Sequence, residues 1–204
     1  YQWIGSSKRM TPDYVLTHFR ETDALLEGHF LLSSGLHSDR YLQCAKVLMH
    51  PERAAILCRA LADKVIASFG EDAVDVVVAP AMGGVVVGYE MARQLKVPGM
   101  FTERVDGVFT FRRGFELAKG ARVIMSEDII TTGKSSRECI DIINEAGGNV
   151  VGATCLIDRS NGTADVGVPI FSLMQMDVKT YPADRLPPEL EKIPAIKPGS
   201  RNLK

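Results

Sequence analysis

The stretch Arg122–Gly148 reads RVIMSEDIITTGKSSRECIDIINEAGG and decides the fold. An apolar run at Val123–Met125 ends on two carboxylates, Glu127 and Asp128, and a loop rich in hydroxyl groups and glycine follows at residues 131–136. A helical pattern then continues to the closing glycine pair. This order predicts a buried strand, a tight loop and a helix N-terminus. Because a helix N-terminus presents unpaired N–H groups and the positive end of its dipole, we expect a phosphate group to bind here.

The side chains of this loop suit a phosphorylated sugar. Thr131, Thr132 and Ser135 supply hydroxyl donors, and Gly133 lets the backbone approach an anion closely. The two carboxylates before them suit ribose hydroxyls or a hydrated Mg²⁺ ion. The alternative, capping threonines beside solvated acids, would usually hold for one acidic strand end. The coincidence of adjacent acids, a Thr-Thr-Gly loop and a helix start favours binding of a sugar phosphate and chemistry on it.

Length and composition narrow the class of protein. The chain has 204 residues, enough for one domain with a full core. Its formal net charge of -1 gives no electrostatic argument for a nucleic acid or a membrane as partner. The four cysteines show no Cys-x-x-Cys pair, so we expect buried free thiols in a reducing compartment and a cytoplasmic protein. Residues 1–9, before Met10, are expected to be a remnant of recombinant expression.

Strand and helix patterns alternate from Pro51 to Ile157, which predicts an α/β fold with a parallel sheet flanked by helices on both sides. An N-terminal hairpin and a proline-rich, mostly irregular tail are expected to form a small hood lobe over the site. We therefore expect a single domain over residues 10–204, with the hood from about 10–45 and 177–204 and the core at about 51–175. One expected helix begins at Pro12, and the others cover residues 51–69, 85–95 and the segment after 133. The expected strands cover residues 29–32, 41–44, 74–79, 99–102, 108–111, 123–125, 150–157 and 170–173.

Loops that carry chemically useful side chains follow the strands of the predicted sheet, where ligands of such sheets bind. Pro80–Gly84 is small enough for its N–H groups to contact a pyrophosphate, although a plain tight turn has the same composition. Arg104, Arg112 and Arg113 form either a cationic lid over a polyanion or a solvated charged hairpin. Arg159 either clamps a ligand carboxylate or pairs with Asp158 or Glu127.

Two nucleotide-binding motifs are ruled out by single positions. Gly133-Lys134-Ser135 resembles the end of an ATPase P-loop, but the motif needs a glycine at position 128, which is aspartate. Gly83, Gly84 and Gly88 resemble a dinucleotide fingerprint, but the middle glycine would stand at position 85, which is valine.

Several segments together resemble the type I phosphoribosyltransferases, and in particular their orotate-specific branch. Glu127–Gly133 is similar to the phosphoribosyl-diphosphate signature of the family, and Phe30–Tyr41 to the N-terminal hairpin of the orotate branch. The other similar segments are 80–84, 101–107, 156–159 and 193–201, so the resemblance spans nearly all of residues 10–201.

The resemblance implies a type I phosphoribosyltransferase fold and one reaction. The 5-phosphoribosyl group of 5-phosphoribosyl 1-diphosphate (PRPP) passes to orotate, giving orotidine 5′-phosphate and pyrophosphate in pyrimidine biosynthesis, with Mg²⁺ held mainly by PRPP and water and no direct protein ligand. A homodimer is implied, in which the mobile loop serves the neighbouring subunit. The residues implied to bind PRPP are Met82, Gly83, Arg104, Arg112, Arg113, Glu127, Asp128, Ile129, Ile130, Thr131, Thr132, Gly133, Lys134 and Ser135, with Arg104 and Asp128 catalytic, and those implied to bind orotate are Tyr41, Leu42, Thr131 and Arg159.

The resemblance leaves one role open. Enteric members carry lysine and histidine in the mobile loop, whereas this chain has Glu103–Gly107, so the cationic role falls to Arg104 or to Arg112 and Arg113. Three other functions are disfavoured. Arg159 argues against a transferase for a neutral base, the net charge argues against a PRPP-sensing regulator that binds nucleic acid, and the length leaves no room for a second decarboxylase domain.

Overall fold

The computed structural model describes residues 10–32 and 34–198, so the expected remnant at residues 1–9 lies outside the described residues. In the described part the strands form two sheets. The central sheet has six strands in the order β5-β4-β3-β6-β7-β8, and the small sheet has three in the order β1-β2-β9. The elements in chain order are α1 (Pro12–Arg20), β1 (Leu25–Leu31), β2 (His37–Leu42), α2 (Cys44–Leu48), α3 (Pro51–Phe69), β3 (Val76–Pro80), α4 (Gly84–Leu95), β4 (Gly99–Val105), β5 (Val108–Phe111), β6 (Arg122–Ile130), α5 (Lys134–Glu145), β7 (Asn149–Asp158), β8 (Ile170–Gln175), β9 (Thr180–Tyr181) and α6 (Pro188–Glu191).

The central sheet is parallel except for its edge strand β5, which pairs antiparallel with β4. Its inner strands are largely buried because helices cover both faces, and β3 is wholly apolar. All five residues of β3 are buried, as are eight of the ten residues of β7. Along the part of the chain that the structure describes, no helix is both long and apolar enough to cross a membrane.

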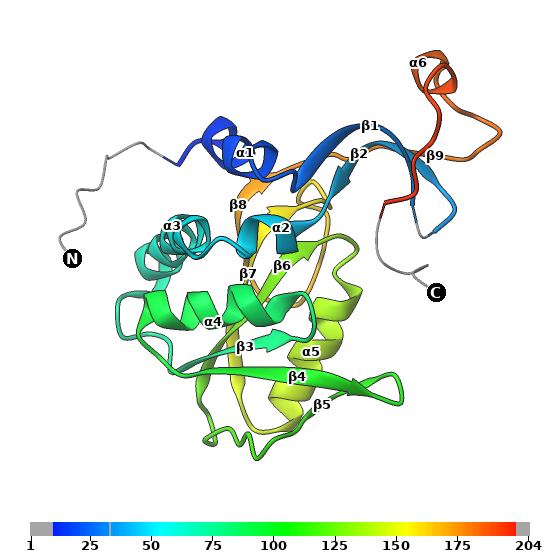
Figure 1. Cartoon of the computed structure of the whole chain (residues 1–204). Helices are drawn as coiled ribbons and strands as arrows, with labels where there is room; N and C mark the ends of the chain where they lie inside the picture. The colour runs from blue at the N-terminus through cyan, green and yellow to red at the C-terminus, as the bar shows by residue number, and fades with distance from the viewer. Residues whose placement is uncertain (1–9, 33, 199–204) are drawn as a thin grey trace.

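Two hydrophobic clusters lie on the two faces of this sheet. One joins α1, α2, α3 and α4 to residues such as Val77, Ile124 and Leu156, and the other joins α5 to Val78 and Met125. Adjacent strand residues point to opposite faces, which is why Val77 and Val78 belong to different clusters. Figure 1 shows α3 and α4 on one side of the strands and α5 on the other. The fold class predicted from the alternating pattern is therefore confirmed.

The small sheet joins the two ends of the described chain. β1 and β2 form an antiparallel hairpin, and β9 pairs with β2 through His37↔Tyr181. The tail also contacts β1, where Ile196 pairs with Phe30. Figure 1 shows this sheet and α6 projecting from the upper part of the molecule, above the central strands. The hairpin and the tail thus form one small lobe beside the α/β core.

Several predicted boundaries were wrong. The hairpin strands were shifted, since β1 starts at Leu25 rather than at residue 29 and Cys44 opens the unpredicted helix α2. β6 continues past the two acids to Ile130, because Ile129 and Ile130 pair with the end of β7. The tail was predicted to be mostly extended or irregular, and it contains two short elements, β9 and α6. Pro188 begins the short helix α6, since proline is tolerated at the first position of a helix.

Candidate active site

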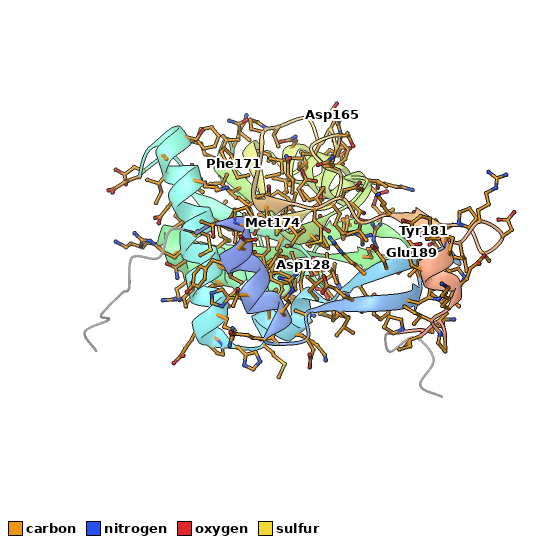
Figure 2. All side chains as sticks on the ribbon, turned by 90° about the horizontal axis from the view of Figure 1, so that it is seen from above. Asp128, Asp165, Phe171, Met174, Tyr181 and Glu189 are labelled. Carbon is orange, nitrogen blue, oxygen red and sulfur yellow. The ribbon has the colours of Figure 1, made fainter. Side chains whose placement is uncertain are left out.

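The candidate site lies where β3 and β6 end side by side. The two strands are neighbours and parallel, with Val76 opposite Val123. The helix after β3, α4, covers one face of the sheet and the helix after β6, α5, covers the other. The two connecting loops therefore leave the sheet in opposite directions, which is the switch point where open parallel sheets bind ligands. Seen from above, Asp128 of β6 lies near the middle of the molecule, whereas Tyr181 and Glu189 lie toward the end of the small sheet (Figure 2).

The two acids of β6 serve opposite faces of the sheet. Glu127 points toward α5, where its Oε2 accepts a hydrogen bond from the hydroxyl of Ser136. Asp128 points toward the start of α4, and a Cβ added to Gly83 would lie 3.2 Å from both of its carboxylate oxygens. Asp128 Oδ1 also accepts the N–H of Ile129 at 2.8 Å. The glycine thus leaves the Asp128 carboxylate uncovered on the side of the 80–84 loop.

Burial perturbs both acids. It raises the pKa of Glu127 to about 7, and the negative charge of Asp128 adds to the rise, while the Ser136 hydroxyl and the charge of Arg104 oppose it. Burial also raises the pKa of Asp128, against the N–H groups that stabilise its ionised form. Desolvated acids at a strand end are typical of functional sites, because a fold gains no stability from them.

The loop after β6 is open to solvent and leads into the N-terminus of α5. Thr131, Thr132, Lys134 and Ser135 are exposed. The N-cap of α5 is Gly133, with φ of 79°, which has no side chain to cap the helix. The hydroxyl of Thr132 accepts the Lys134 N–H at 3.3 Å, and the N–H groups of Ser135 and Ser136 have no acceptor among the described residues. A Cβ at Gly133 would also lie 2.9 Å from Val166 Cγ1, so both the backbone and the space require glycine there. The predicted phosphate site is therefore geometrically available.

The two isoleucines between the acids and the threonines take part through their backbone. Ile129 and Ile130 pair with Ile157 and Asp158 of β7. Ile130 is 1% exposed, so its side chain belongs to the interior.

The loop after β3 brings small residues close to β6. The Ala81–Met82 peptide bond is cis, and the Ala81 N–H donates to Thr102 O at 2.8 Å. A Cβ on Gly84 would meet the Ser126 carbonyl oxygen at 3.0 Å, which shows how closely the first turn of α4 approaches β6. Met82 is 83% exposed. Of the two residues of this loop predicted to bind PRPP, Gly83 lies beside Asp128, and Met82 is exposed directly before it.

The three loop arginines have different surroundings. Arg104 donates to Gly107 O and to Glu138 Oε2 of α5, both at 2.6 Å, and its guanidinium lies 4.0 Å from the centre of the Phe109 ring. Its charge also acts on Glu127. Arg104 is therefore held next to the first turns of α5.

The other two arginines, Arg112 and Arg113, directly follow β5, the second strand of the hairpin. Arg113 makes two hydrogen bonds of 2.9 Å to the carboxylate of Glu103. Arg112 is exposed and makes no ion pair within residues 10–32 and 34–198. Of the three arginines, Arg104 is the one that forms a hydrogen bond and ion pair with α5 among the described residues.

Arg159 follows β7 and lies beside the end of β6, because its N–H donates to Ile130 O at 2.8 Å. Its Nε is buried and has no hydrogen-bond partner among the described residues, and burial lowers the pKa of the guanidinium. The carboxylate of Asp158 instead accepts from the hydroxyl and N–H of Ser160 and from the N–H of Gly162. The expected alternative, an ion pair with Asp158 or Glu127, is not found in the described part of the chain.

The segment that follows β2 contacts the end of β6 through Cys44. This residue lies two positions after Leu42, and its Sγ is 4.0 Å from Asp128 O. The charge of Arg159 also acts on its thiol, while burial raises the pKa of that thiol well above the usual value. Tyr41 and Leu42, predicted to frame a base, therefore end a strand that leads to the acids and to Arg159.

Three site residues were missed by the sequence prediction: Ser136, Glu138 and Cys44. A signal existed for Ser136. It occupies the same helical stripe as Cys139, Ile140 and Ile143, and a polar residue in such a buried stripe needs a hydrogen-bond partner. Glu138 had no such signal, since an exposed acid on a helix is usual.

Comparison with known proteins gives consistent results. Residues 46–180 match the family model described as phosphoribosyl transferase domain. The chain is 59% identical over 194 residues to an orotate phosphoribosyltransferase of Maricaulis maris, covering 95% of this chain and 100% of the relative. It is 58% identical over 195 residues to one of Caulobacter vibrioides, covering 96% and 100%. Its fold is similar to the crystal structure of orotate phosphoribosyltransferase from Aeropyrum pernix, with a TM-score of 0.67 at 23% identity, over 79% of this chain and 93% of that one.

Proposed function

The chain belongs to the phosphoribosyl transferase family, and we propose that its reaction is the transfer of the 5-phosphoribosyl group from PRPP to orotate. The products are orotidine 5′-phosphate and pyrophosphate, as in de novo pyrimidine biosynthesis. The proposal is supported by the relatives from Maricaulis maris and Caulobacter vibrioides, which match nearly the whole chain and are named orotate phosphoribosyltransferase.

The buried Nε of Arg159 is the observation that carries the choice of base. A buried donor without a partner costs free energy, and a carboxylate would relieve it with a charge-assisted hydrogen bond. Orotate carries a carboxylate, whereas adenine, hypoxanthine and uracil do not. By this proposal Arg159 binds the orotate carboxylate, Thr131 contacts the base, and the backbone of Tyr41 and Leu42 frames it.

The same proposal assigns PRPP to the β3–β6 switch point. The open N–H groups and hydroxyls from Thr131 to Ser135 hold the 5-phosphate, and Glu127 and Asp128 accept hydrogen bonds from the ribose hydroxyls. The loop at Met82 and Gly83 binds the diphosphate through its backbone. Lys134 is exposed at the rim and adds positive charge to this side.

Catalysis then depends on positioning and on charge. The bond between the anomeric carbon and pyrophosphate breaks and a bond from orotate N1 to that carbon forms, so no protein nucleophile is needed. The N1 proton passes to water or to the released pyrophosphate, so no strong protein base is needed. The chain contributes orientation of the two substrates and neutralisation of the leaving group. We assign the neutralising cation to Arg104, because its contacts with Gly107, Glu138 and Phe109 hold it beside α5.

Mg²⁺ fits this donor set as an ion that arrives with the substrate. No group of three or more His, Cys, Asp or Glu side chains that could hold a metal occurs in the described part of the chain. Glu127 and Asp128 are two adjacent carboxylates that can reach a hydrated ion through water. When bound with PRPP, the ion adds positive charge at the leaving diphosphate.

A homodimer is the assembly we propose. Val86 and Tyr89 lie on one face of α4 and are 50% and 72% exposed, and Met82, just before this helix, is 83% exposed. An apolar stripe of this kind beside the site favours contact with a second copy. Sedimentation analysis of the parent and of Val86→Asp tests it. We expect the parent to be a dimer and the variant to dissociate.

A cytoplasmic location is part of the proposal and is supported by the cysteines. Cys44, Cys58, Cys139 and Cys155 are buried free thiols, which suits a reducing compartment.

One assay tests the proposed activity. Orotate consumption is followed by absorbance with the purified chain, PRPP and Mg²⁺, and each component is left out in turn. We expect consumption only in the complete mixture. Adenine, hypoxanthine and uracil are then supplied in place of orotate, and a faster reaction with one of them would transfer the proposal to that base.

A further inference from the structure

Ser136 is a buried polar residue in the first turn of α5. It is 1% exposed and lies on the helix face that packs with Cys139 and Ile140. Its hydroxyl donates a hydrogen bond to Glu127 Oε2. Burying a hydroxyl costs free energy unless it is paired, so this contact accounts for a serine within an otherwise apolar stripe.

The backbone of the same residue belongs to the predicted phosphate site. The first hydrogen bond of the helical kind at this end runs from Arg137 N–H to Gly133 O at 2.8 Å. In residues 10–32 and 34–198 the N–H groups of Ser135 and Ser136 have no acceptor. Ser136 therefore offers its N–H to an anion while its side chain holds the carboxylate that faces the sugar.

We propose that Ser136 is a positioning residue that couples the 5-phosphate site to the ribose site by fixing the carboxylate of Glu127. Its hydroxyl occupies Oε2 and leaves Oε1 free to accept from a ribose hydroxyl. The inference rests on the proposed function, because it takes a ribose 5-phosphate group as the ligand.

The charges around Glu127 explain why such a residue matters. Asp128 on the same strand disfavours the ionised form of Glu127, and Arg104 from the hairpin favours it. The thiols of Cys139 on α5 and Cys155 on β7 also face it. The Ser136 hydroxyl is the hydrogen-bond donor that stabilises the ionised carboxylate, which is the form that accepts most strongly from a ribose hydroxyl.

The chain offers a matched control for deletion of this hydroxyl. Ser126 is also fully buried and lies next to Glu127 in β6, but its side chain points to the other face of the sheet. Its hydroxyl has no hydrogen-bond partner among the described residues. Ser126→Ala thus also removes a buried hydroxyl group, at the residue next to Glu127, and leaves the hydrogen bond between Ser136 and Glu127 intact.

The experiment uses two probes, ribose 5-phosphate and inorganic phosphate, with calorimetry at pH 8 on the full chain. For Ser136→Ala we expect binding of ribose 5-phosphate to weaken about tenfold, the loss that accompanies a hydrogen bond to a charged group, and binding of inorganic phosphate to stay within about twofold. Ser126→Ala should leave both unchanged. In a Glu127→Gln background, Ser136→Ala should have little further effect on ribose 5-phosphate.

Three results of the binding comparison would overturn the inference. They are equal weakening of both probes, which indicates damage to the anion site, no weakening of either, and full additivity with Glu127→Gln. The pH dependence of ribose 5-phosphate binding is a further readout, since Ser136→Ala should move its acid limb to higher pH, and an unmoved limb also contradicts it. Neither probe requires orotate. Failure of the parent in the orotate assay would therefore refute the proposed function and leave this test intact.

Discussion

Replacing Glu127 with glutamine should stabilise the protein without ligand while it impairs PRPP binding. The carboxylate is largely removed from water in β6, and its pKa is raised from 4.5 to about 7. Between these two values the folded chain keeps a proton that the unfolded chain has lost. Stability therefore falls as pH rises through this window, and the cost is fully present above pH 7. Glutamine has the shape of the protonated acid and cannot ionise, so it escapes that cost.

The size of the effect follows from the shift. A rise from 4.5 to about 7 corresponds to about 3 kcal/mol. Partial exposure and salt screening reduce this, so we expect a gain of roughly 1–3 kcal/mol at pH 8. For a chain of this size each kcal/mol raises Tm by about 2–4 °C. Near pH 4.5 the parent and the variant should have nearly equal Tm.

Thermal unfolding of both proteins from pH 4.5 to pH 8.5 measures this difference. Asp75→Asn is the control of opposite sign, because hydrogen bonds from Arg122 lower the pKa of Asp75 to about 2. That variant should lose a little stability, by the same amount at pH 5 and at pH 8. A Glu127→Gln difference that is independent of pH, or a variant less stable than the parent at pH 8, would refute the reasoning about burial.

Three further substitutions test other parts of the site. Arg159→Ala should raise the KM for orotate at least tenfold and leave the KM for PRPP within about twofold, since it removes a charge-assisted hydrogen bond. Steady-state kinetics measure both constants, and an unchanged KM for orotate would show that Arg159 does not bind the orotate carboxylate. Arg104→Ala should lower kcat about a hundredfold and weaken orotate binding much less; near-normal turnover would remove Arg104 from catalysis. Gly133→Ala should lower the free energy of unfolding by about 1–3 kcal/mol, because φ is 79° and the new Cβ would lie 2.9 Å from Val166, and a denaturant titration that shows no loss contradicts this.

The fold could be predicted well from the sequence because its signals are local and strong. Pro51 at the start and Gly70 after the end delimit α3, and the predicted range matches the observed one. The boundaries that failed depend on pairing with distant residues. β6 reaches Ile130 because β7 lies beside it, and a serine- and acid-containing segment does not indicate a strand by itself. Cys44 begins a helix directly after β2, where no residue of the capping type marks the start.

Only the part of the candidate site that lies in one continuous stretch of sequence could be predicted. The stretch Glu127–Ser135 predicts an anion site, because it contains a pair of carboxylates, a Thr-Thr-Gly loop and the start of a helix. Which of the three loop arginines contacts α5 could not be predicted, because the contact depends on how the hairpin lies against Glu138 in the folded chain. The same holds for the partner of Arg159, whose nearest acid in sequence, Asp158, proves to be occupied by Ser160.

The charged side chains of the site are best explained as groups whose binding partners are supplied by a ligand. Glu127 and Asp128 are desolvated acids, and neither forms an ion pair within the residues that the structure describes. Arg159 is a desolvated cation that also lacks such a partner there, although it lies beside the end of the same strand. A fold selected for stability alone would join these charges or replace them with apolar groups. Keeping them separate costs stability, and that cost is recovered when a ligand offers hydroxyl donors to the acids and a carboxylate to the arginine. PRPP and orotate together have those groups, which neither a neutral base nor a simple phosphate ester provides.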